Sequence, residues 1–143
     1  MPITLKRVYE EPARADGARV LVDRLWPRGI SKDGAKLTAW LRELAPSNEL
    51  RKWYHAHPSQ WQTFRKKYLD ELRNSEAADE LEQLYVLVAA HSRVTLLYAS
   101  RERDRNNATV LKELIEGSRK PPSTSGAVRV AGLKRNRAKA PRP

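Results

Sequence analysis

The sequence predicts a single α/β domain with a small, largely parallel sheet and helices on both faces. Two short runs, residues 18–24 and 94–99, contain consecutive Val and Leu residues, as is typical of strands covered on both sides. Amphipathic segments lie between these runs and after the second one. The order strand, helices, strand, helix favours parallel strands joined by helical crossovers.

The other segments complete this order. Residues 3–9 are expected to be extended, and residues 36–44 to be a helix or turn that carries Trp40. Ser47 has the position and chemistry of a helix N-cap, followed by Glu49 in the first turn. Three more helices are expected: one beginning at Pro58-Ser59, one from Ser75 to about His91, and one from Ala108 that stops at Gly117.

Composition narrows the possible chemistry. Of the 143 residues, 40% are apolar and 31% charged, which is an ordinary balance for a globular protein. No apolar run approaches the roughly 20 residues of a membrane helix, and residues 1–9 lack the apolar core of a signal peptide, so we expect a cytoplasmic protein. The absence of cysteine excludes disulfides and thiolate chemistry, and three histidines are too few for a rich metal site. We therefore expect neither a metal nor a cofactor.

The net charge of +11 is unevenly distributed. Residues 118–143 contain eight Lys or Arg and no acidic residue, which leaves only +3 for residues 1–117. We interpret 1–117 as the α/β domain and 118–143 as a basic, flexible tail. Such a tail is either a solubilising extension or an arm that contacts the phosphates of nucleic acid.

The best candidate site follows the second apolar run. Ligands of open parallel sheets lie beyond the carboxyl ends of the strands, and a helix N-terminus attracts anions. Here Ser100, Arg101, Asn106 and Asn107 supply hydrogen-bond donors between a strand and a helix. The alternative is that an Asp or Asn of this loop caps the helix and that the arginines are solvated or paired with neighbouring acids.

The first apolar run ends in a second polar loop, which a parallel sheet would place at the same edge. Its candidate ligand-binding residues are Arg24, Trp26 and Arg28, and Asp23 is a candidate general base. Asp23 and Arg24 could equally brace the loops, because charges at a strand end need partners. Trp26 could cover the site as a lid or cap the edge of the sheet.

Two further patterns favour structural roles. The spacing of Trp53, Tyr54, Trp61, Phe64 and Tyr68 could form a base-stacking platform, but helical periodicity favours core packing. His55 and His57 are two residues apart with no third ligand beside them, so a metal site is not expected.

Four ordered motifs resemble a known family. They are VLVDRLWPRGISK at 20–32, LAPS at 44–47 with WYH at 53–55, WQTFRKKY at 61–68, and VTLLYASR at 94–101 with the Asn106-Asn107 pair. Together they resemble the YeaO-like branch of the domain-of-unknown-function family numbered 488, over about residues 3–116. The resemblance implies a compact single-domain α/β protein of bacterial or archaeal type, with no established biochemical role.

The resemblance also bears on the loop before the last helix. Some relatives outside the branch carry a Cys-His-Arg signature there, whereas this chain has Asn106, Asn107 and Ala108. A thiol- or histidine-based activity is therefore not implied.

Three functions remain open from the sequence. The leading hypothesis is a module that binds an anionic small molecule, nucleotide or phosphate group at the strand ends. The second is a nucleic-acid-binding protein that uses the tail. The third is a hydrolase or transferase acting on a phosphate-bearing substrate, with Asp23 as base and Arg24 or Arg101 stabilising charge. The oligomeric state is not predicted.

Overall fold

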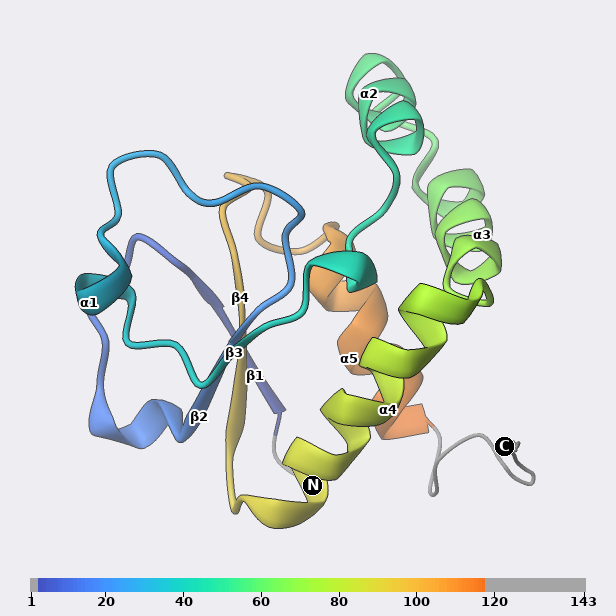
Figure 1. The fold of residues 1–143 in the computed structure, drawn as a ribbon. Coiled ribbons are helices and arrows are strands. Elements are labelled where there is room, and N and C mark those ends of the chain that lie inside the picture. The colour runs from blue at the N-terminus through green and yellow to red at the C-terminus, as the bar shows by residue number, and fades with distance from the viewer. Residues whose placement is uncertain (1–2, 118–143) are drawn as a thin grey trace. The chain divides into compact units, whose positions relative to one another are not determined.

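The computed structural model describes residues 3–117, and within them the chain forms one all-parallel sheet (Figure 1). The strand order is β1–β4–β2–β3. The strands are β1 (Ile3–Arg7), β2 (Ala18–Leu21), β3 (Ala39–Trp40) and β4 (Val94–Tyr98). The predicted parallel α/β fold is confirmed. Residues up to Lys112 form one compact unit, and residues from Glu113 are assigned to a second.

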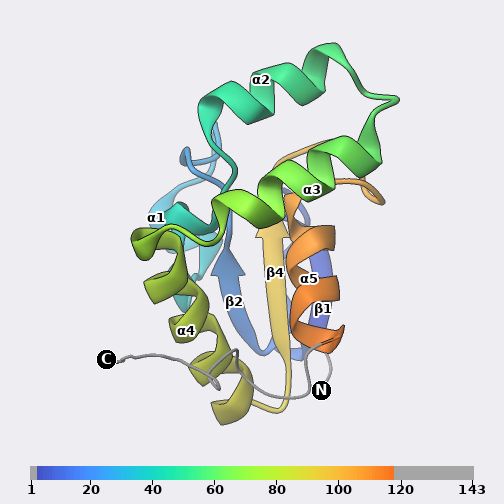
Figure 2. The same ribbon diagram turned by 90° about the vertical axis from the view of Figure 1, so that its right-hand side faces the viewer.

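Helices lie on both faces of the sheet, but unequally. The short α1 (Lys32–Ala35) lies on one side, whereas α4 (Ser75–Ala90) and the first turns of α5 (Asn107–Gly117) lie on the other (Figures 1 and 2). Helices α2 (Asn48–Ala56) and α3 (Trp61–Glu71) form a hairpin between β3 and α4. Two 3-10 turns, η1 (Arg14–Asp16) and η2 (Arg42–Leu44), complete the described elements.

The register of the sheet positions the site. All five residues of β4 are buried, because β1 and β2 pair with it on its two sides. Arg7 pairs with Tyr98, and Leu21 pairs with Leu97, so these three strands end at nearly the same level. The loops after β2 and β4 therefore leave the same edge of the sheet side by side, as the sequence predicts.

An apolar cluster covers the face of the sheet nearer α1. Val8, Leu21 and Leu97 are its buried members, and Trp26 and Trp40 are among the partly buried residues packed against it. Because side chains alternate along a strand, Val20 and Leu96 point to the opposite face, where α4 and the first turns of α5 lie. Both faces of β2 and β4 are thus covered, which explains their runs of consecutive apolar residues.

The expected helix or turn over residues 36–44 is wrong for residues 39–40, which include Trp40. Residues 39–40 form β3, which pairs with Val20 and Leu21 of β2, and only residues 42–44 are helical. A two-residue strand has too little alternation to reveal itself, and pairing with the edge of β2 decides its conformation.

The helix starts are close to those expected. The hydroxyl of Ser47 accepts a hydrogen bond from the backbone N–H of Leu50 at 3.0 Å, so Ser47 is the N-cap of α2. Helix α4 begins at Ser75, as expected, and Asn74 is its N-cap, because the Asn74 side chain accepts the backbone N–H of Ala77 at 2.8 Å. Helix α3 begins at Trp61 rather than at Pro58.

Two further expectations concern the C-terminal tail and membrane-spanning helices. The tail at 118–143 lies outside the described residues. Across residues 3–117, no helix combines the length and apolar composition needed to cross a bilayer.

Candidate functional site

Asp23, Ala99 and Asn107 join the carboxyl ends of β2 and β4 to the start of α5. One carboxylate oxygen of Asp23 accepts the backbone N–H of Ala99 at 2.8 Å, and the other accepts the side-chain amide of Asn107 at 3.2 Å. The same amide donates to the carbonyl oxygen of Val22 at 2.8 Å. The two predicted loops are thus linked directly, and Asn107 is at the centre of the link.

Burial raises the pKa of the Asp23 carboxyl above its usual value. The hydrogen bonds from Ala99 and Asn107 and the positive charge of Arg51 oppose this rise without cancelling it. A raised pKa suits a general base. However, both oxygens of this carboxylate already accept hydrogen bonds from the fold, which supports the bracing role.

The loop after β4 is held by its own side chains. Asn106 caps α5, because its Oδ1 accepts the backbone N–H of Thr109 at 3.0 Å, while its Nδ2 donates to the carbonyl of Glu102 at 2.7 Å. The Ser100 hydroxyl accepts the N–H of Glu102 at 3.0 Å. The capping alternative for Asn106 is therefore the one that the structure adopts.

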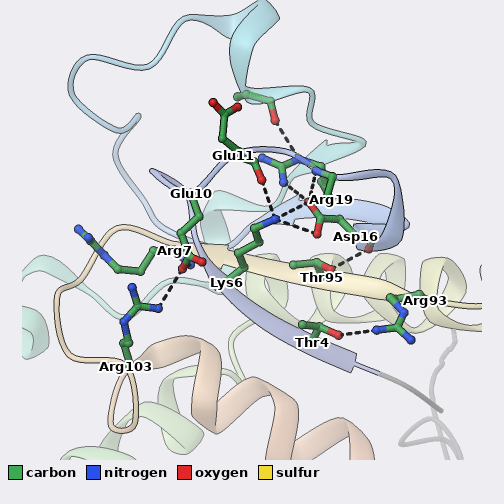
Figure 3. A network of polar contacts seen from close by, with 12 residues as sticks. Thr4, Lys6, Arg7, Glu10, Glu11, Asp16, Arg19, Arg93, Thr95 and Arg103 are labelled. Atoms are coloured by element: carbon green, nitrogen blue, oxygen red, sulfur yellow. Dashed lines mark hydrogen bonds and ion pairs between the residues drawn. The ribbon is translucent and has the colours of Figure 1, made fainter.

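The end of β1 clamps the same loop. The Arg7 guanidinium donates to the carbonyl oxygens of Ala99 and Ser100, both at 2.9 Å. Arg103 forms an ion pair with Glu10 at 2.9 Å, shown at the left of Figure 3, and the hydrogen bond from Arg103 holds the pKa of Glu10 below its usual value. Sequence reasoning missed Arg7 and Glu10, because more than 90 residues separate them from their partners.

Three exposed arginines remain available near the strand ends. Among residues 3–117, the side chains of Arg101 and Arg105 make no hydrogen bond or ion pair. Arg51, on α2, is also exposed, and its charge is close enough to lower the pKa of Asp23. Burial raises the pKa of Tyr54, one turn further along α2; Glu102 adds to this rise, and Arg105 opposes it. The charged groups of the loop and of α2 therefore act on one another, which the sequence did not indicate.

The α2–α3 hairpin orients Arg51. Both oxygens of the Glu71 carboxylate bind Ser47, one accepting its N–H at 2.8 Å and the other its hydroxyl at 2.6 Å. The Tyr54 ring stacks on Phe64 with centroids 4.3 Å apart, and Phe64 is buried. These aromatic residues therefore pack the two helices together, which is the core-packing role that their helical spacing favours.

The other three predicted site residues of the loop after β2 take no part in the Asp23–Asn107 link. Arg24 forms an ion pair with Glu43 at 3.4 Å and donates to the carbonyl of Ala45 at 3.2 Å, so it binds η2 and the residue after it. Trp26 packs edge-on against Trp40, with ring centroids 5.3 Å apart. Arg28 is exposed, and its carbonyl oxygen accepts the hydroxyl of Tyr9 at 3.1 Å. Thus the loop after β2 contributes Asp23 to the strand-end linkage, whereas Arg24 and Trp26 are held by contacts with other residues.

Comparison with known proteins places the chain in a family. The model of the "Inactive DUF488-N3 subclade" matches residues 2–126, which is most of the chain. The chain belongs to the DUF488 family. The resemblance drawn from the four motifs is thereby confirmed.

This DUF488 protein aligns with curated relatives over nearly their whole length. The chain is 43% identical over 115 residues to "Uncharacterized protein Rv3073c" of Mycobacterium tuberculosis, covering 80% of this chain and 94% of the relative. It is also 43% identical over 113 residues to "Uncharacterized protein YeaO" of Escherichia coli, covering 79% of this chain and 96% of the relative. No solved structure matches the chain. These relatives support a YeaO-like DUF488 protein, and their names state no function.

Proposed function

We propose that this DUF488 protein is a binding module for an anionic, phosphate-bearing ligand at the edge of the sheet where β2 and β4 end. The observation that carries the proposal is that two elements supply exposed arginines near the rigid Asp23–Ala99–Asn107 link. Arg101 and Arg105 follow β4 in the loop, and the charge of Arg51 on α2 lowers the pKa of Asp23. Arginine suits this role, because its planar guanidinium donates two parallel hydrogen bonds to phosphate or carboxylate oxygens.

The cations of this surface come from the loop after β4 and from α2. Arg101 and Arg105 are exposed and make no hydrogen bond or ion pair within the described residues, so ligand binding would break none of their contacts. Arg51 adds a third guanidinium. The first turn of α5 adds the partial positive charge of a helix N-terminus. Arg7 and Glu10 limit the ordering cost of binding, because they already hold the loop in place.

The acidic groups of the same surface select the ligand. Each oxygen of Asp23 accepts one hydrogen bond from the fold, and Glu102 accepts the backbone N–H of Asp104 at 3.1 Å. Their negative charge weakens the attraction for small free anions. A ligand that adds contacts beyond its phosphate, such as a nucleotide, therefore fits this surface better than a phosphate ion alone.

Binding has more support than catalysis. The matching family model is described as inactive, and both oxygens of Asp23 are used within the fold. Asn106 and Asn107 are likewise engaged, one as a helix cap and the other in the link between strands. An enzyme with Asp23 as general base would have to use the remaining lone pairs of a carboxylate that already joins the two loops.

Calorimetry with inorganic phosphate and with a nucleoside monophosphate tests the proposal. Arg101→Ala and Arg51→Ala should each weaken binding about tenfold, the loss expected for one charge-assisted hydrogen bond. Arg14→Ala is a matched control, because Arg14 is an exposed arginine before the amino end of β2 and should leave affinity unchanged. Equal effects of all three variants, or no binding of either probe, would refute the proposal.

Nucleic-acid binding through residues 118–143 is the second candidate. The eight basic residues and the lack of acids in this segment favour it. It requires an affinity for DNA or RNA that falls steeply with salt and is largely lost when residues 118–143 are deleted. Absent or salt-insensitive binding at low ionic strength would exclude it.

A further inference from the structure

A second cationic cluster lies on the face of the sheet nearer α1. It consists of Lys6 on β1, Asp16 in η1 and Arg19 on β2 (Figure 3). Lys6 Nζ lies 3.0 Å from one oxygen of the Asp16 carboxylate, and Arg19 Nη1 lies 2.5 Å from the other. Only 5% of the Arg19 side chain is exposed, so its charge is well removed from water.

The Asp16 oxygen that faces Arg19 already accepts three hydrogen bonds. Arg19 Nε donates to the carbonyl of Ala35 at 3.0 Å, and Arg19 Nη1 donates to Asp16. The same Asp16 oxygen also accepts the backbone N–H of Ala13 at 2.9 Å and Lys6 Nζ at 3.1 Å. No capacity is left there for Arg19 Nη2, which is buried and has no hydrogen-bond partner among the described residues.

The charges of the cluster do not balance. Hydrogen bonds from Ala13, Lys6 and Arg19 outweigh burial and lower the pKa of Asp16, so its carboxylate is ionised at neutral pH. Within the cluster, Lys6 and Arg19 stand against this single negative charge, and a guanidinium does not lose its proton in proteins. The charge of Lys6 also acts on Glu10, but that carboxylate is already paired with Arg103. A buried charge without a counterion is costly, and an unpaired donor adds to that cost.

We propose that Arg19 Nη2 anchors a binding site for a small monovalent anion of chloride size, held together with Lys6 on the α1 side of the sheet. Such an anion would both accept the remaining N–H groups and neutralise the excess positive charge. The nitrogen is covered from solvent, so neighbouring side chains must shift to admit even an ion of this size. A water molecule would satisfy the hydrogen bonds but leave the charge in place. This site is independent of the strand-end surface.

Anomalous diffraction from crystals of the full chain grown in bromide locates the anion directly. The expected result is a bromide peak within contact distance of Arg19 Nη2. A water molecule, the exposed carboxylate of Glu11 or a segment of residues 118–143 at that position would overturn the proposal.

A solution measurement distinguishes a resident anion from one forced in by crystal concentrations. At constant ionic strength, replacing gluconate with chloride should raise the melting temperature saturably, by about 5 °C at ten times the dissociation constant. Arg19→Lys keeps the charge but removes the Nη2 donor, so it should lose this rise. Arg93→Lys makes the same change at an exposed arginine that contacts Thr4, and should retain it. A melting temperature of the unaltered chain that is insensitive to chloride would refute the proposal, whether or not Arg19→Lys folds.

Discussion

Replacing Asn107 with alanine removes the side chain that connects the ends of β2 and β4 to α5. In the native chain its Nδ2 donates to the carbonyl of Val22 at 2.8 Å and to the Asp23 carboxylate at 3.2 Å. Asn107 is 9% exposed, so water has limited access to the groups that would lose their donor. The Asn107→Ala variant leaves a buried carbonyl and a carboxylate oxygen without this partner.

The expected cost follows from these two bonds. A buried carbonyl that loses its donor costs about 1 kcal/mol or more, and a bond to a charged acceptor adds about 1.5 kcal/mol at the weak end of its range. The 3.2 Å distance to Asp23 places that bond at the weak end. The variant should therefore lose about 2–3 kcal/mol of the free energy of unfolding, a large share of the roughly 5–15 kcal/mol typical of a domain.

Urea denaturation followed by circular dichroism measures this loss. With an unchanged slope, the midpoint should fall by about 2 M. Asn48→Ala is the matched control, because Asn48 is likewise the first residue of a helix but is exposed, and it should change stability by less than about 0.5 kcal/mol. If both variants cost the same, Asn107 does not hold the strand ends together and the reasoning about the site fails.

Three further predictions follow from the same contacts. Arg7→Gln should accelerate hydrogen exchange of amides in the 100–105 loop while lowering global stability by only about 1 kcal/mol, because the clamp acts locally; unchanged exchange would contradict the clamp. Ser47→Ala should cost about 1–2 kcal/mol in urea denaturation, since it removes the α2 cap and the hydroxyl contact with Glu71; a loss below about 0.5 kcal/mol would show that neither contact matters. Burial raises the pKa of Asp23, so the folded state binds its proton more tightly than the unfolded state, and stability should fall as pH rises from 3.8 through the folded pKa. Asp23→Asn should flatten this part of the pH profile, and an unaltered slope would contradict the assignment.

Much of the fold is predictable because the sequences of β2 and β4 identify them as buried strands. Consecutive apolar residues in both runs reflect burial on two faces, and helical segments between them leave few alternatives to parallel pairing. Ser47 is predictable for a similar reason, since capping is local chemistry. The short β3 is not predictable, because its pairing partner rather than its own sequence sets its conformation.

The candidate site is predictable only in part. The meeting of Asp23 with the loop after β4 follows from strand direction, and so does the position of Asn107 at that edge. The direction of Arg24 does not follow, because it depends on where η2 and Glu43 lie. The position of Arg51 could not be predicted, because it depends on the direction of α2. The contact between Ser47 and Glu71, which are 24 residues apart, sets that direction.

Nuclear magnetic resonance on the labelled full chain tests the central claim most directly, by titrating a nucleoside monophosphate at constant ionic strength and following the amide and arginine side-chain signals. If the strand ends form a phosphate-binding surface, saturable shifts will concentrate in residues 100–109 and at the Arg101 and Arg51 side chains. Shifts that do not saturate, or that gather at the amino end of the sheet around Arg14, would contradict the claim.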